Sequence, residues 1–406
     1  MSDLRLAAAY LKARLLVTTL TVISVALGLG LAVSVLLFSH QSKDTLAREA
    51  GAYDLIVGAK GSPLQLVLNS LYYLDAPVGN IDTALWERLQ KNPSVAAAVP
   101  VNMGDNYLGA PIVGTTPEFL TGRKPARGDT LLAQGRVFAK PFEATVGAQV
   151  AALHALAVGQ RIIGAHGWGK TDDFHPQFPY TIVGILAPTG AALDRAVFTD
   201  YHSTWIVHAH PDPDEQAEGP PHDPTHQVTS VLVRLKQAGR RFGMVQEINS
   251  RESAMAAVPV DQISRLVAVF IAPLQGVLLL VAYLVIVVAS LTILIGLYLT
   301  IHQRRRDIAV LRAIGATRLD VFRMITVEAA TIAGLGVVCG WLCGHGLVAA
   351  LSPLLATRFG VAPSAWQVNP LELAIGASVW VLGILAGILP AAVAYRLPVA
   401  DALSAE

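Results

Sequence analysis

Four long stretches of uncharged, mainly apolar residues limit what this chain can fold into more than any other feature. An α-helix rises 1.5 Å per residue, so about 20 apolar residues cross the roughly 30 Å hydrocarbon core of a bilayer. Each stretch is longer than that, and a mean hydropathy of +0.51 with 15% charged residues fits the same class. The stretches are residues 15–38, 266–301, 329–355 and 371–395. They predict an α-helical membrane protein with four transmembrane helices, and the first is too long for the apolar part of a signal peptide.

The basic residues predict the orientation of these helices, because arginine and lysine near membrane spans collect on the cytoplasmic side. Arg5, Lys12 and Arg14 precede the first stretch, and six arginines lie in 302–328, whereas 356–370 contains only Arg358. We therefore expect a multi-pass protein of the cytoplasmic membrane. Both termini (1–14 and 396–406) and the 302–328 loop would be cytoplasmic, and 356–370 would be a short external loop.

Residues 39–265 would then form one large domain outside the cytoplasm, periplasmic or extracellular. Short apolar segments predict strands and periodic segments predict helices, which together give a mixed α/β fold. The expected strands are 161–164, 180–187, 203–207 and 228–235, and the expected helices are 144–156 and 243–257. Cys339 and Cys343 both lie in the third apolar stretch, so this domain contains no disulfide.

The segment GAHGWGKT at 164–171 matches the phosphate-binding pattern G-x-x-x-x-G-K-[ST]. A true phosphate loop opens a helix whose N-terminal amides hold the phosphate. The residues that follow, DDFHPQFPY, have no helical period, and the predicted topology places them on the side without ATP. We predict a hairpin loop here.

The segment HAHPDPDEQAEGPPHDPTHQ at 208–227 is rich in histidine, proline and acidic residues. Its histidines, His208, His210, His222 and His226, are weak candidates for a divalent metal, because imidazole and carboxylate suit zinc or copper. A solvated loop without metal has the same composition, and we favour it. No hydrolase, metalloprotease or paired-cysteine motif occurs, so we predict no catalytic residue and no enzyme activity.

The first two apolar stretches carry further signals. Gly28, Gly30 and Ser34 in GLGLAVS permit close helix contact and predict an interface with a second chain, although glycine is also simply common in membrane helices. The second stretch would measure about 54 Å as a helix, more than a bilayer core needs. It predicts a stalk that extends beyond the membrane, with a bend at Pro273.

Residues 304–323, RRRDIAVLRAIGATRLDVFR, predict an ordered helix-turn-helix inside the basic loop. Ile308, Val310, Leu311 and Ile314 would form an apolar stripe, Gly315 would end the first helix, and Thr317 with Asp320 would cap the second. An ordinary basic loop lying on lipid headgroups would explain the arginines but not these helix-ending and capping signals.

RRRDIAVLRAIGATRLDVFRMITVEA resembles the cytoplasmic coupling segment of FtsX-like or MacB-type ABC transporter permeases. GILAGILPAAVAYRLPVADAL resembles the end of the same family, and GRVFAKPFEATVGAQVAALHALAVGQRI and YTIVGILAPTGAALDRAVF are similar to its periplasmic core. These matches cover most of the chain in the order that the family requires.

The resemblance implies the permease subunit of a mechanotransmission-type ABC transporter. It would form a dimer of four-span chains and work with a separate cytoplasmic ABC ATPase dimer that holds ATP and magnesium, with no cofactor in this chain. Asp307 stands where the family commonly has glutamate. The coupling residues carried over by position are Arg305, Asp307, Leu311, Arg312, Ala313, Ile314 and Gly315.

Three roles fit this description: efflux with a periplasmic adaptor, extraction of lipids or lipoproteins, or FtsX-like regulation of a cell-wall hydrolase without transport. An apolar face over 63–73 mildly favours an amphipathic cargo or contact with membrane lipid, but a core helix explains it equally well. The residues of that face are Leu64, Leu66, Val67, Leu71 and Tyr72. Nothing predicts a nucleic-acid partner.

Overall fold

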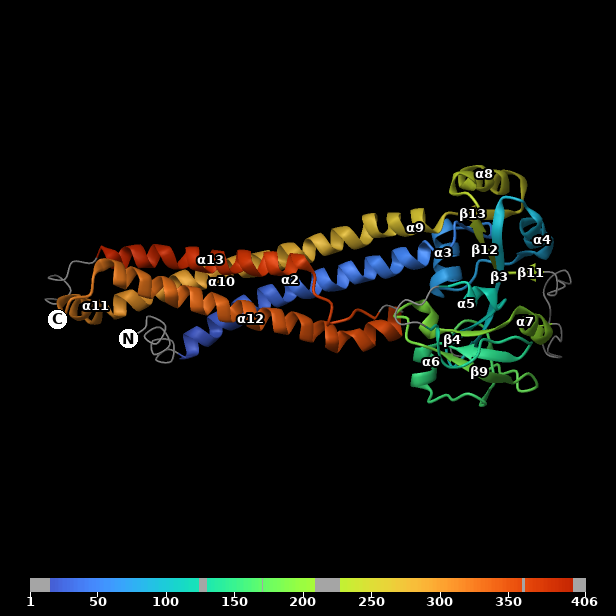
Figure 1. Ribbon diagram of the computed structural model, residues 1–406, viewed down its shortest axis with the longest axis horizontal. Coiled ribbons are helices and arrows are strands. Elements are labelled where there is room, and N and C mark those ends of the chain that lie inside the picture. Colours follow the sequence, from blue (N-terminus) through green and yellow to red (C-terminus); the bar gives the residue numbers. More distant parts are fainter. Residues whose placement is uncertain (1–14, 124–129, 170, 209–226, 360–361, 397–406) are drawn as a thin grey trace. The chain divides into compact units, whose positions relative to one another are not determined.

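The computed structural model describes residues 15–123, 130–169, 171–208, 227–359 and 362–396 (Figure 1). Contacts within the chain divide it into two compact units. The helical unit contains described residues 15–41, 270–351 and 363–396, and the sheet unit contains residues 42–269 and 352–362 with the gaps given above.

Among the described residues, four helices are long and apolar enough to cross a membrane, as the sequence predicts. Each extends beyond the apolar stretch that predicts it. Their bounds are α2 (Leu15–Ala50), α9 to α10 (Pro259–Gln303), α12 (Arg318–Phe359) and α13 (Pro370–Tyr395). A short helix, α11 (Arg305–Ala313), lies between α10 and α12.

The helix that contains Pro273 changes type next to this residue. The α-helical segments α9 (Pro259–Leu266) and α10 (Ala272–Gln303) are joined by five residues of π-helix, Val267–Ile271. Proline lacks an N–H and its ring crowds the carbonyl four residues earlier, and a π-helical turn relieves both problems. The irregularity predicted at Pro273 is thus present as a π-helix that precedes the proline.

Small residues bring α2 and α12 close together within the helical unit. Gly336, Gly340 and Gly344 recur every four residues of α12, and a Cβ atom on each would lie 2.6–2.9 Å from a side-chain atom of α2. Such spacing lets two helix backbones approach closely. The four long helices share one apolar core, which includes Leu29 of α2 and Ile293 of α10.

The prediction that Gly28, Gly30 and Ser34 face a second chain is wrong in this structure. A Cβ atom on Gly28 would lie 2.8 Å from Cγ1 of Ile286 in α10, and one on Gly30 would lie 3.1 Å from the Gly340 carbonyl oxygen of α12. The Ser34 hydroxyl is buried and donates to the Gly30 carbonyl oxygen of its own helix. The small residues of α2 therefore serve packing within the chain.

The sheet unit is built on a mixed β-sheet of eleven strands among the described residues. Its main path runs β13-β1-β12-β3-β4-β10-β6-β9-β5, while β7 pairs with β9 and β8 pairs with β3. The pairs β4/β10 and β6/β9 are parallel and the others antiparallel. The strands are β1 (Leu55–Ala59), β3 (Val95–Tyr107), β4 (Ala110–Thr115), β5 (Leu132–Gly135), β6 (Glu143–Val146), β7 (Arg161–Ile162), β8 (Ala165–His166), β9 (Tyr180–Leu186), β10 (Val197–Asp200), β12 (Ser230–Leu235) and β13 (Ala254–Ala257).

Apolar cores cover both faces of this sheet. In β1, Ile56 packs into one core, while Leu55 and Val57 pack into another. A strand buried on both faces reads as a continuous apolar run, which is why LIV carries no alternation. A separate pair, β2 (Ile81–Asp82) with β11 (Gln227–Val228), lies off the main sheet, and the helices are α3 (Pro63–Tyr72), α4 (Thr83–Lys91), α5 (Glu118–Thr121), α6 (Ala148–Leu153), α7 (Tyr201–His208) and α8 (Arg241–Arg251).

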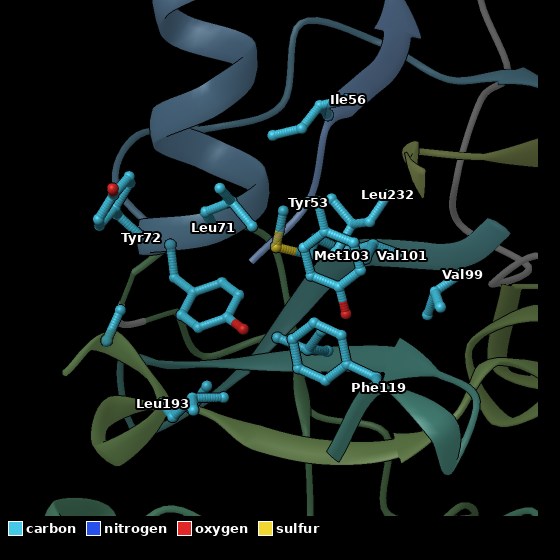
Figure 2. Packing of buried hydrophobic residues seen from close by; sticks show 14 of the residues in the cluster. Tyr53, Ile56, Leu71, Tyr72, Val99, Val101, Met103, Phe119, Leu193 and Leu232 are labelled. Carbon is cyan, nitrogen blue, oxygen red and sulfur yellow. The ribbon is translucent and has the colours of Figure 1, made fainter. Parts of the chain in front are cut away.

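The apolar face predicted to touch cargo is part of this core. Leu66, Val67, Leu71 and Tyr72 on α3 are buried, and Leu64 is half-buried. Figure 2 shows Leu71 at the end of α3 on the side of the strand side chains, and the Tyr72 hydroxyl donates to the Leu46 carbonyl oxygen of α2 (2.6 Å). The core-helix interpretation of 63–73 is correct, and the cargo-face prediction is wrong.

Three predictions of secondary structure also need correction. The run 203–207, predicted as a strand, lies in helix α7, because Asp200 accepts a hydrogen bond from the His202 amide (2.9 Å) and turns the chain into a helix. The predicted helix 144–156 contains β6 before α6, and the predicted helix 243–257 contains β13 after α8. The predicted strands at 180–187 and 228–235 are confirmed over most of their length, and of 161–164 only Arg161–Ile162 is a strand.

Candidate functional site

The basic segment between α10 and α12 folds into a short helix with defined ends. Helix α10 ends at Gln303, and the Arg304 amide donates to the Thr300 carbonyl oxygen (3.0 Å). Helix α11 begins at the next residue. The chain therefore passes from a membrane-type helix into α11 through a single residue that is outside both helices.

Gly315 ends α11 as predicted. Its φ is +114°, a left-handed conformation that side chains rarely adopt. The Ala316 amide donates to the Leu311 carbonyl oxygen (3.0 Å), and the Gly315 amide donates to the Arg312 carbonyl oxygen (3.2 Å). These two bonds form the Schellman motif, which stops a helix and turns the chain sharply.

Thr317 and Asp320 start α12 with a reciprocal cap, also as predicted. The Asp320 amide donates to the Thr317 hydroxyl oxygen (3.2 Å), and the Thr317 amide donates to Asp320 Oδ2 (2.8 Å). This is the capping-box arrangement, with aspartate in place of the usual glutamate. The turn between the two helices is thus fixed on both sides by hydrogen bonds.

The apolar residues of α11 divide between two faces, and the predicted single stripe is wrong. Ile308 and Ala309 are buried, and Ile308 shares a core with Val321 of α12. Val310 is 47% exposed and Ile314 is 77% exposed. One face of α11 anchors it to the helical unit, and a second apolar face is left uncovered by the described residues.

Most of the predicted coupling residues are exposed. Leu311 and Arg312 are half-buried, and the other five are exposed. The exposed ones are Arg305, Asp307, Ala313, Ile314 and Gly315. Asp307, Val310 and Ile314 are spaced three and four residues apart and so form one strip along the helix, which we call the α11 strip. Val310 was absent from the predicted set.

The helical unit also contains a buried polar cluster that sequence reasoning missed. Glu372 is 1% exposed. Its Oε2 accepts a hydrogen bond from Trp341 Nε1 (3.0 Å) and also lies 2.8 Å from His345 Nε2. Its Oε1 accepts from the Asn369 amide (2.7 Å), which completes a capping box at the start of α13. The sequence placed Glu372 at the edge of a span, but it did not indicate that two aromatic residues of α12 would meet it.

Of the four histidines proposed as weak metal candidates, His208 lies at the end of α7, and His210, His222 and His226 lie outside the described residues. His208 Nε2 is 3.2 Å from Asp105 Oδ1, and His166 Nδ1 is 3.5 Å from the same oxygen. Burial raises the pKa of Asp105, but the imidazoles of His166 and His208 outweigh it and hold the pKa at about 2. This carboxylate is therefore ionised at neutral pH.

The phosphate-loop lookalike at 164–171 forms part of a hairpin. Ala165 and His166 form β8, and Ala165 also bridges Phe174 on the returning segment. No helix begins in the described residues 171–179. The hairpin prediction is confirmed, since the helix that a phosphate loop requires does not follow.

Comparison with known families accounts for both units. Residues 18–250 match the MacB-like periplasmic core domain, and residues 279–402 match the FtsX-like permease C-terminal domain. The chain belongs to the FtsX/MacB-type family of ABC transporter permeases. The first match contains most of α2 and of the sheet unit, and the second contains most of α10 together with α11, α12 and α13.

Individual relatives are more distant. The macrolide export ATP-binding/permease protein MacB of Shewanella oneidensis is 24% identical over 332 residues, which cover 77% of this chain and 46% of the relative. MacB of Escherichia coli K12 is 34% identical over 136 residues, which cover 33% of this chain and 20% of that relative. The chain spans about half the length of the first of these relatives.

Among solved structures, the chain is similar to the periplasmic region of MacB from Actinobacillus actinomycetemcomitans. The likeness covers 54% of this chain and 95% of that region, with 10% identity and a TM-score of 0.32.

Proposed function

We propose that this chain is the membrane subunit of an ABC transporter whose ATP hydrolysis is performed by a separate ATPase dimer that docks on α11. The α11 strip carries the proposal. It combines an uncovered apolar surface, Val310 and Ile314, with the exposed carboxylate of Asp307. Burying such a surface against a partner is favourable, at about 25 cal/mol per Å² of apolar area.

The ends of α11 suit a transmitting element. Helix α11 is held by a Schellman motif at one end and is separated from α10 by Arg304 alone at the other, so it cannot shift far without moving its neighbours. The helix Pro259–Gln303 runs for 45 residues up to Arg304 without a loop. A force applied at α11 would therefore reach residues well beyond a bilayer core, since 45 helical residues measure about 68 Å.

A role in transport is better supported than a role in regulating a cell-wall hydrolase. The match to a MacB-like periplasmic core extends over residues 18–250, and the relatives named above are exporters by name. We propose export of a peptide or another amphipathic molecule, with or without a periplasmic adaptor. Since α3 is part of the core, the 63–73 segment no longer supports lipid or lipoprotein extraction.

We further propose that two copies of the chain pair through α10 rather than α2. The most apolar window of α2 is 67% buried within the chain, whereas that of α10 is only 22% buried. A helix that is already surrounded has little surface left for a second chain. The broad apolar surface of α10 can face lipid or the partner copy.

Substitution of Ile314 tests the proposed docking. We expect Ile314→Asp to reduce ATP hydrolysis in complexes purified through a tag on the full-length chain by at least tenfold, because a charge would enter an apolar contact. Ile314→Met keeps an apolar side chain and should retain most of the activity. Unchanged hydrolysis in Ile314→Asp, with normal amounts of the chain in the membrane, would exclude the α11 strip as the docking surface.

A further inference from the structure

Three elements of the sheet unit bring nitrogen and oxygen ligands together at one point. Asp105 lies on β3, His166 lies directly opposite it on β8, and His208 lies at the end of α7. Because Asp105 and His166 form a cross-strand pair, their side chains leave the sheet on the same face. The ligand atoms of the three residues all lie within 4.8 Å of one another.

A β-bulge aims Asp105 at this point. Met103 pairs with Val113 and Asp105 pairs with Ile112, so Gly104 is an extra residue in β3. In a regular strand, Met103 and Asp105 would point to the same face, but the extra residue reverses the alternation. Met103 accordingly packs in an apolar core, whereas Asp105 faces α7.

The spacing of the ligand atoms suits a small metal ion. Two ligands at 2.0–2.1 Å from a tetrahedral metal are about 3.4 Å apart. Asp105 Oδ1 is 3.2 Å from His208 Nε2 and 3.5 Å from His166 Nδ1. His175 supplies a further nitrogen, since its Nε2 is 3.8 Å from the same oxygen. His166 and His208 are partly exposed, so their rings can adjust around an ion.

The hydrogen-bond pattern also points to a missing ligand. The Asp105 side chain is 1% exposed, and its buried Oδ1 faces the imidazoles of His166 and His208 without forming a well-aligned hydrogen bond among the described residues. The buried Nε2 of His175 has none either. A buried polar atom without a partner costs about 1–3 kcal/mol, and a bound cation would satisfy the carboxylate oxygen and the ring nitrogen together.

We propose that Asp105, His166 and His208, with His175 as a fourth ligand, bind one divalent transition-metal ion in the sheet unit. Histidine nitrogens with one carboxylate oxygen suit zinc, and copper(II) and nickel(II) share the preference for imidazole. A pocket of about 210 Å³, lined by His166, His208 and Asn102 among others, lies against the ligands and is large enough to admit a hydrated ion. The ion would tie α7 to β3 and to the β8 hairpin.

The histidines of the 209–226 segment are the main competing source of metal binding, and the experiment must separate them from this site. A useful internal control is His202, which is on the same helix as His208 and has its own carboxylate, since its Nδ1 lies 2.6 Å from Asp200 Oδ1. The His202 ring is exposed, and within the described part of the chain no second histidine forms an ion pair with Asp200. His202→Ala should leave metal binding intact.

Zinc binding by the full-length chain, purified in detergent and freed of metal with a chelator, tests the proposal. Calorimetry should show one Zn²⁺ per chain that Asp105→Asn, His166→Ala and His208→Ala each weaken at least tenfold, the smallest loss expected even for residues that only support a metal ligand. X-ray absorption should show at least two imidazoles with Zn–N distances of about 2.0–2.1 Å. A variant enters the comparison only if its unfolding temperature in the presence of chelator equals that of the unsubstituted chain, so that lost binding does not reflect lost folding.

Two results would overturn the proposal. One is a chain that binds neither Zn²⁺ nor Cu²⁺. The other is a chain in which replacing His210, His222 and His226 together by alanine abolishes binding, while Asp105→Asn and His208→Ala leave it unchanged.

Discussion

At the residue scale, buried polar side chains mark the places where this permease departs from a simple apolar bundle. In the helical unit, the two ring nitrogens of His345 both face acceptors: Nδ1 lies 2.5 Å from the Ala365 carbonyl oxygen and Nε2 lies 2.8 Å from Glu372 Oε2. A carbonyl cannot donate, so Nδ1 carries a proton. The second contact then needs a proton on either Nε2 or Glu372, and in both cases the pair has no net charge. Such a pair is less costly to bury than a lone carboxylate.

Replacing Glu372 should destabilise the helical unit. In Glu372→Gln, one acceptor oxygen becomes a donor, so at least one of the N–H groups of Asn369 and Trp341 faces another donor. We expect a loss of about 1–3 kcal/mol in the free energy of unfolding, the usual cost of an unsatisfied buried group. Thermal unfolding in detergent measures this, and Leu373→Ala on an exposed position of the same helix is the control. Equal unfolding temperatures for Glu372→Gln and the unsubstituted chain would contradict this account of the cluster.

At the element scale, the sequence predicts features that depend on neighbouring residues and fails for those that depend on distant ones. The Gly315 stop and the Thr317–Asp320 cap are local, and both are present. The orientation of an apolar face is not local. The small residues of α2 and the apolar side of α3 could face a partner, a cargo or the protein's own core, and only the positions of other elements decide between these.

The same limit explains why the sequence did not predict the metal-ligand cluster. Asp105, His166 and His208 are widely separated in sequence and meet only through the β3/β8 pairing and the Gly104 bulge. The mispredicted strand has a local cause instead: the segment 203–207 contains β-branched residues that favour a strand, but the nearby Asp200 accepts from the His202 amide and a helix begins there. The sequence indicated His208 because it begins a segment rich in histidine, proline and acidic residues. Asp105 and His166, which lie beside His208 in the fold, stand in segments without such a composition.

The close contact between α2 and α12 makes a prediction at this scale. In Gly340→Ala, the new methyl group would lie 2.9 Å from Leu29 Cβ and 3.0 Å from the Ala26 carbonyl oxygen, so the helices must separate. We expect a loss of about 1–3 kcal/mol in the free energy of unfolding, as for other overpacked contacts. Thermal unfolding of the full chain in detergent is the measurement.

Gly346, on the same helix, provides the matched control. A Cβ atom there meets no atom within 4 Å, so Gly346→Ala should be neutral or slightly stabilising, since alanine favours a helix over glycine. Similar effects of the two substitutions would show that helix propensity, and not the α2–α12 contact, determines the outcome.

At the scale of the whole molecule, this FtsX/MacB-type permease carries its two proposed sites in different units of the chain. The family match covers both units, and the chain connects them through the continuous helices α2 and α9 to α10. The proposed metal site lies in the sheet unit and the proposed ATPase contact lies in the helical unit. Loss of metal binding and loss of ATPase docking can therefore be measured separately.

The central claim is that α11 contacts an ABC ATPase, and photo-crosslinking from position 314 in the full-length chain in its own membranes tests it most directly. We predict a crosslink from position 314 to an ABC ATPase, identified by mass spectrometry. No such crosslink should form from position 295, an exposed apolar residue in the middle of α10. If position 314 crosslinks only to lipid, or if position 295 captures the ATPase equally well, α11 is not the element through which ATP hydrolysis acts on this protein.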